Sequence, residues 1–104
     1  MPITQLGLVN ENEIRDGVQR AEKALAPDVV RIRYTVKEDW SGDQSIFFRV
    51  LLSDSASAES GLREITQRVE FRVVNEVRPP EWLLTYFNFR SQSEQAQLRE
   101  PAWE

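Results

Sequence analysis

The chain has 104 residues, of which 40% are hydrophobic and 29% are charged, and its formal net charge is -4. This length and composition support one globular domain with one core, and the acidic balance disfavours non-specific attraction to nucleic-acid phosphates. The sequence contains no cysteine and no histidine, which excludes disulfides, thiolate metal sites and catalysis by a histidine base.

The amino-terminal arm, residues 1–10, is mildly apolar, and we expect an edge strand, a packed segment or a dimer contact there. The arm has no basic segment leading into an apolar stretch, and the apolar runs along the chain are far too short to cross a bilayer. We therefore expect a cytoplasmic protein with no membrane contact.

A helix over residues 11–26 is the first element that the pattern predicts. Asn10 and Glu13 have the spacing of an N-cap residue and its reciprocating glutamate. Pro27 ends the helix because proline cannot continue the hydrogen-bonded ladder. Apolar residues recur at helical intervals at Ile14, Val18, Ala21 and Leu25.

Two strands joined by a turn follow the helix. Residues 29–38 and 45–53 alternate between the two faces of a strand, whereas residues 39–44 have the composition of a turn. The side chains expected to face the core are Val30, Ile32, Tyr34, Val36, Ile46, Phe48, Val50 and Leu52.

A second helix is predicted to end before Pro79. Residues 54–61 offer several hydroxyl and carboxylate caps for its start. Phe71 and Val74 lie off its apolar stripe, so we expect this helix to touch something besides its own sheet. The stripe itself is formed by Leu62, Ile65, Val69, Val73 and Val77.

A third strand, residues 82–91, is dense in aromatic side chains, and its Leu83, Phe87 and Phe89 are expected to join the core. Residues 92–104 are mostly polar and predict a fraying tail that could carry a short helix. We therefore place one domain at residues 1–91 and a polar tail at residues 92–104.

These elements predict an α+β fold in the order α-β-β-α-β, with a three-stranded, mainly antiparallel sheet and two helices packed on one of its faces. The order resembles that of KH-type RNA-binding domains of the bacterial kind. The resemblance is one of topology only, because the glycine-x-x-glycine loop of those domains is missing.

The sheet face turned away from the helices mixes arginine with large aromatic side chains, which are enriched in interface hot spots. We expect this face to bind a protein partner or a second copy, unless the tail, the arm or the second helix covers it. Arg90 is the residue best suited to direct contact. The predicted partner-binding residues are Arg31, Arg33, Phe47, Arg49, Trp82, Tyr86, Asn88 and Arg90.

Two other functions are alternatives. Bases of a single-stranded nucleic acid could stack on the aromatic residues of the face, although the acidic charge and the lack of a motif weigh against this. An enzyme would need Asp39, Asp43 and Asp54 to converge in a pocket, for example around Mg²⁺. We expect no catalytic residue, no metal site and no cofactor.

The loop at residues 39–43 places two carboxylates beside Trp40, as a hard-cation loop or a small ligand cradle would. Calcium loops need about six to eight oxygen ligands, so two carboxylates are too few. We therefore predict a polar hairpin turn that is capped by a packed Trp40.

Three stretches carry a further resemblance: Asp-Trp-Ser-Gly-Asp at residues 39–43, Ile-Phe-Phe-Arg-Val at residues 46–50 and Tyr-Phe-Asn-Phe-Arg-Ser at residues 86–91. With them the chain looks like a family of small bacterial proteins of no assigned activity, similar in character to the antidote halves of toxin-antitoxin pairs. The resemblance spans most of the chain and assigns no role to any single residue.

Overall fold

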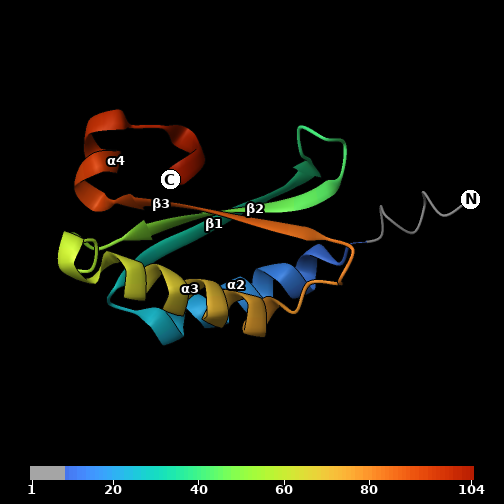
Figure 1. The fold of residues 1–104 in the computed structure, drawn as a ribbon, viewed down its shortest axis with the longest axis horizontal. Coiled ribbons are helices and arrows are strands. Elements are labelled where there is room, and N and C mark those ends of the chain that lie inside the picture. The colour runs from blue at the N-terminus through green and yellow to red at the C-terminus, as the bar shows by residue number, and fades with distance from the viewer. Residues whose placement is uncertain (1–8) are drawn as a thin grey trace, which may run out of the picture.

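A three-stranded sheet lies between two layers of helix in the computed structural model of the chain, which describes residues 9–104 (Figure 1). The elements are α2 (Glu11–Leu25), β1 (Val29–Glu38), β2 (Gln44–Leu52), η1 (Glu59–Gly61), α3 (Leu62–Val77), β3 (Leu84–Ser91), α4 (Gln92–Leu98) and η2 (Pro101–Trp103). The prediction for the amino-terminal arm falls mainly on residues 1–8, which lie outside the described residues.

The predicted α+β class and the order of the first five elements are confirmed, but the prediction of two helices is wrong. The described chain has three α-helices: α2 and α3 cover one face of the sheet, and α4 with η2 lies over the other (Figure 1). The start of α4 is fixed by a capping box, in which the Ser91 hydroxyl accepts from the Glu94 N–H at 3.1 Å and the Glu94 carboxylate accepts from the Ser91 N–H at 2.9 Å.

The strands lie in the order β1-β2-β3, and the sheet is mixed. β1 and β2 form an antiparallel hairpin, whereas β3 pairs in parallel with β2 because α3 carries the chain back across the sheet. In this register Phe48, at the centre of β2, is paired with Tyr34 on one side and with Phe87 on the other.

The two helices beneath the sheet approach each other closely at Gly17. A Cβ atom at this position would lie 2.7 Å from the carbonyl oxygen of Glu76 and 2.8 Å from the Cα of Val77, so a side chain would force α2 and α3 apart. Beside this crossing the Arg20 guanidinium donates to the Glu76 carboxylate at 2.9 Å.

One predicted core residue, Val30, is wrongly placed by strict alternation. The register shifts between Val29 and Arg31, so Val30 is an extra residue in β1 and its side chain is exposed, while Val29 is buried in its place. The buried cluster is formed by Ile14, Val18, Ala21, Leu25, Val29, Ile32, Ile46, Phe48, Val50, Leu52, Ile65, Val69, Val73, Val77 and Leu83.

None of the helices in residues 9–104 has both the length and the apolar character that crossing a bilayer requires.

Candidate functional site

The outer face of the sheet, which is turned away from α2 and α3, holds the predicted partner-binding residues of all three strands. Cross-strand pairing places on this one face the pairs Arg31 with Leu51, Arg33 with Arg49, Thr35 with Phe47, Phe47 with Tyr86, Arg49 with Asn88 and Leu51 with Arg90. Trp82 does not share it, because it precedes β3 in a turn, where its side chain is partly exposed.

Four arginines of this face, Arg31, Arg33, Arg49 and Arg90, are called the arginine half below. The carbonyl oxygens of residues 102–104 accept hydrogen bonds from three of them: from Arg49 at 2.7 Å, from Arg31 at 3.3 Å and from Arg33 at 2.7 Å. The carboxyl-terminal segment therefore crosses the arginine half and is held there through its main chain.

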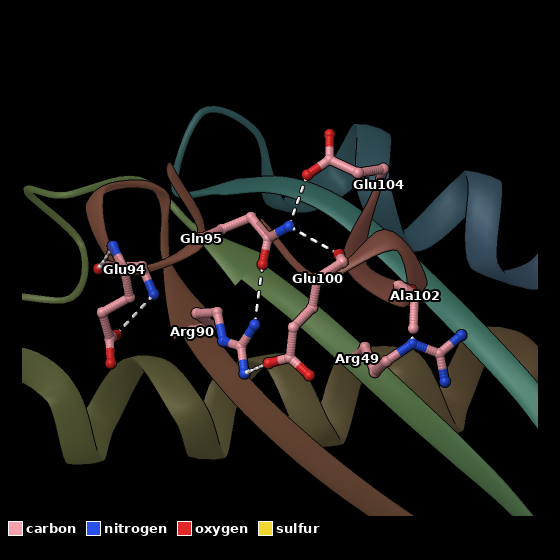
Figure 2. Close-up of polar contacts among 8 residues, drawn as sticks. Arg49, Arg90, Glu94, Gln95, Glu100, Ala102 and Glu104 are labelled. Atoms are coloured by element: carbon pink, nitrogen blue, oxygen red, sulfur yellow. Dashed lines mark hydrogen bonds and ion pairs between the residues drawn. The ribbon is translucent and has the colours of Figure 1, made fainter. Parts of the chain in front are cut away.

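The fourth arginine is the centre of a polar cluster, which Figure 2 shows. Arg90 donates to the side-chain carbonyl of Gln95 at 2.8 Å, forms an ion pair with Glu100 at 2.6 Å and stacks over the ring of Trp103 at 4.4 Å. The Gln95 amide in turn donates to the carbonyl oxygen of Glu100 at 2.8 Å and to the carboxylate of Glu104. The side chain of Trp103 is only 7% exposed.

Burial by this segment changes the chemistry of the arginine half. Leu51 lies under it and is buried, although it faces away from the main core. Burial lowers the pKa of Arg49, and the positive charge of the neighbouring Arg33 lowers it further. The tail therefore covers the outer face, as one alternative expected, over the arginine half of that face.

The other half of the outer face is open, and its rings form a cluster that we call the aromatic platform: Trp40, Phe47 and Tyr86. Phe47 and Tyr86 are stacked with their ring centroids 5.0 Å apart, and Trp40 lies tilted against Tyr86 at 5.3 Å. The ammonium of Lys37 lies 5.1 Å from the ring centre of Phe47, a cation–π distance.

The hairpin turn that presents Trp40 is polar, as predicted, but the prediction of a packed Trp40 is wrong. The indole is 82% exposed. The turn residues Ser41, Gly42 and Asp43 beside it are exposed as well, so they offer no apolar pocket that could enclose a large ring.

Asp39 holds this turn in one conformation. One of its carboxylate oxygens accepts from the N–H and the hydroxyl of Ser41 at 2.9 and 2.7 Å and from the N–H of Asp43 at 3.0 Å. The other accepts from the hydroxyl of Tyr86 at 2.8 Å. The Ser41 hydroxyl is the largest cause that holds the pKa of Asp39 far below its usual range. The hydrogen bond from the Tyr86 hydroxyl to the Asp39 carboxylate raises the pKa of Tyr86.

The three carboxylates considered for an enzyme do not converge. The Ser41 hydroxyl lies within hydrogen-bond distance of both Asp39 and Asp43, but Asp54 lies at the opposite end of β2, where it accepts from the N–H and hydroxyl of Ser93 at 2.9 and 2.7 Å. Asp54 thus caps the start of α4. Among residues 9–104 no group of three acidic, histidine or cysteine side chains is placed to hold a metal ion.

Sequence reasoning placed Trp40 wrongly and left open whether residues 92–104 cover this face. Trp40 carried a signal, since an indole flanked by Ser, Gly and Asp in a short turn has little chance of burial. The covering segment carried another: Ser91 and Glu94 have capping-box spacing, and Trp103 is a lone aromatic residue in a polar stretch.

Comparison with known proteins identifies no relative of the chain. No protein-family model, no curated protein and no solved structure matches the chain.

Proposed function

We propose that the chain is a protein-interaction module whose partner binds the open half of the outer sheet face. The observation that carries the proposal is the aromatic platform. Trp40 is 82% exposed, yet its turn is fixed by the hydrogen bonds of Asp39 and its ring lies against Tyr86. An exposed aromatic side chain that is already ordered loses little conformational entropy on binding, and tryptophan and tyrosine dominate binding hot spots.

The carboxyl-terminal segment supports this proposal by example. It lies on the same face, accepts hydrogen bonds from arginines through its carbonyl oxygens and inserts one aromatic side chain, Trp103, against Arg90. These are contacts that a partner polypeptide would also make with an arginine- and aromatic-rich surface. Asn88, exposed in β3 beside the platform, offers a further amide for a partner main chain.

The resemblance to antidote proteins agrees with such a role, because an antidote acts by binding its toxin partner. A bacterial, cytoplasmic protein that binds a neighbouring protein is therefore part of this proposal. The stretch at residues 39–43, one of those that carry the resemblance, is also the turn that presents Trp40.

Binding of single-stranded nucleic acid is the alternative that the same rings would suit. Two features weigh against it. The arginines that would meet phosphates already donate to the carboxyl-terminal segment, and Asp39 and Asp43 add negative charge beside the platform.

The proposal is tested by selecting a displayed random-peptide library on the intact chain and measuring the affinity of the selected peptides. Trp40→Ala should raise their dissociation constant by about 30-fold or more, the loss typical of a hot-spot residue. Phe71→Ala is the matched control, since Phe71 is another largely exposed ring, on the opposite layer, and it should leave the affinity unchanged. Selected peptides that bind Trp40→Ala as well as the wild type contradict the proposal, and salt-dependent binding of a labelled oligothymidylate would favour the alternative.

A further inference from the structure

Two residues of the arginine half, Arg33 and Arg49, lie opposite each other on β1 and β2 and are called the arginine pair below. They are direct partners in the antiparallel pairing, so their side chains leave the sheet on the same face. Burial lowers the pKa of Arg49, and the charge of Arg33 lowers it further, so the two charges act on each other. Like charges directly opposite each other destabilise a sheet. The arginine pair is therefore unfavourable for the fold taken by itself.

No side-chain carboxylate offsets these two charges within residues 9–104. Neither arginine takes part in an ion pair there. Both donate only to main-chain oxygens and to the hydroxyl of Thr35. The carboxylates of Glu100 and Glu104 in the covering segment are directed to other side chains. A charge-assisted partner for the arginine pair is therefore missing from the described part of the chain.

Both members of the arginine pair keep donor groups that a ligand can use. Nε of Arg33 and Nη2 of Arg49 donate to no atom of residues 9–104. One N–H from each arginine can meet one oxygen of a carboxylate, in hydrogen bonds about twice as strong as those between neutral groups. Arg33 is exposed and Arg49 is half-buried, so a ligand can reach them while the carboxyl-terminal segment stays in place.

Arg49 lies at the boundary between the covered arginine half and the aromatic platform. Its Nε donates to the carbonyl oxygen of Ala102 at 2.7 Å, and its Nη1 donates to the hydroxyl of Thr35 at 3.0 Å. Thr35 is the cross-strand partner of Phe47, a ring of the platform. Phe47 and Arg49 are two residues apart on β2, which separates them by about 6.5 Å along the strand. A ligand that rests on the platform therefore reaches the arginine pair with a short extended segment.

We propose that the partner segment bound by the aromatic platform is acidic, and that one of its carboxylates is bound between Arg33 and Arg49. The inference rests on the proposed function, because it names the chemistry of the partner at the same face. An extended segment that runs along β2 has the same two-residue period as the strand beneath it. The acidic residue should therefore lie two positions from the apolar residue that contacts Phe47.

Charge around the platform favours a peptide over a nucleic acid as the source of this anion. Lys37 and the arginine pair place positive charge beside Phe47, whereas Asp39 and Asp43 make the hairpin end of the platform acidic. A nucleic acid carries a phosphate at every nucleotide, so some of its phosphates would meet these aspartates. A peptide can place one acidic residue on the arginine pair and uncharged or basic residues at the turn.

The inference is tested with peptides selected on the intact chain, which are remade with the acidic residue replaced by its amide. With the wild-type chain the amide should raise the dissociation constant by about 10-fold, the loss expected when a charged hydrogen-bonding group is removed. With Arg33→Gln the acid and the amide should bind alike. Arg63→Gln is the matched control, because Arg63 is exposed on α3, beneath the other face of the sheet (Figure 1). This variant should keep the wild-type preference for the acid.

Trp40-dependent peptides that carry no acidic residue, or that bind equally well as acid and amide, overturn the inference and leave the proposed function standing. An acid preference that persists in Arg33→Gln overturns it as well. Peptides whose binding ignores Trp40→Ala overturn both proposals.

Labelled oligothymidylate tests the source of the anion. If it binds the wild-type chain and loses binding on Arg33→Gln, the arginine pair is a phosphate site and the inference is wrong. A flat oligothymidylate titration together with the preference for the acid supports the acidic peptide.

Discussion

The hydroxyl of Tyr86 donates a hydrogen bond of 2.8 Å to the carboxylate of Asp39, and this contact ties the β1–β2 hairpin turn to β3. The turn residue and the strand residue are 47 positions apart in the chain. The contact fixes Tyr86 between Phe47 and Trp40, and so it fixes the aromatic platform as a unit.

The first prediction concerns the ionisation of Tyr86. Its pKa is raised mainly because its hydroxyl is bonded to the Asp39 carboxylate, whose charge also opposes phenolate formation. The chain has two tyrosines, so Tyr34→Phe leaves Tyr86 as the one phenol in an ultraviolet titration. In that background Asp39→Ala should lower the pKa of Tyr86 toward the ordinary value of about 10. An unchanged titration curve would show that the contact is absent in solution.

The second prediction is the acid response of the hairpin turn. The folded-state pKa of Asp39 is depressed, so its stabilising effect is complete above the usual aspartate range and is lost as the pH falls through the depressed pKa. The amide resonances of Ser41 and Asp43 should therefore stay constant from neutral pH down to about 4 and move only in stronger acid. Asp39→Asn should abolish this late transition; a transition that persists in the variant would assign it to another group.

The third prediction compares the covered Trp103 with the exposed Trp40. Trp103→Ala should release residues 92–104 from the arginine half, with a loss of local stability of about 2–4 kcal/mol. The release should be seen as faster hydrogen exchange of the Arg99 N–H, which donates to the Gln95 carbonyl at 2.7 Å. Trp40→Ala is the control, because an indole that is 82% exposed contributes little to stability. If both variants exchange alike, the segment is not anchored by Trp103.

The fourth prediction concerns the crossing of α2 and α3. Gly17→Ala places a Cβ within 2.7 Å of the Glu76 carbonyl oxygen, so the helices have to separate. We expect its free energy of unfolding in urea to fall by about 1–3 kcal/mol. Gly61→Ala meets no atom within 4 Å and should be neutral or slightly stabilising. Equal stabilities for the two variants would rule out the close approach.

Most of the fold could be predicted because it rests on local periodicity. Local patterns in the sequence predicted the capping pair Asn10 and Glu13, the helical stripe that includes Val69 and the alternation of β2. The hydrogen bond from the Glu13 N–H to Asn10 is present at 3.2 Å. Val30 could not be placed in this way, because a bulge adds one residue without changing the pattern of residue types.

The outer face was harder to predict, because its state depends on what covers it. Alternation correctly put Arg49 and Arg90 on that face. The covering of both by residues 92–104 depends on contacts between distant segments, such as that of Arg49 with Ala102, which no local pattern encodes. The exposure of Trp40 had a local signal in its turn of Ser, Gly and Asp, whereas its contact with the ring of Tyr86 is a tertiary one.

The central claim, that the open half of the outer face binds a protein partner, is tested most directly by the indole N–H signals in a ¹H–¹⁵N correlation spectrum. The chain has three tryptophans, and each reports one region: Trp40 the aromatic platform, Trp82 the turn before β3 and Trp103 the covered arginine half. On titration with a peptide selected on the intact chain, the Trp40 signal should shift while that of Trp103 stays in place. A peptide that binds and shifts Trp103 while leaving Trp40 unmoved would contradict the claim and place the binding site under the carboxyl-terminal segment.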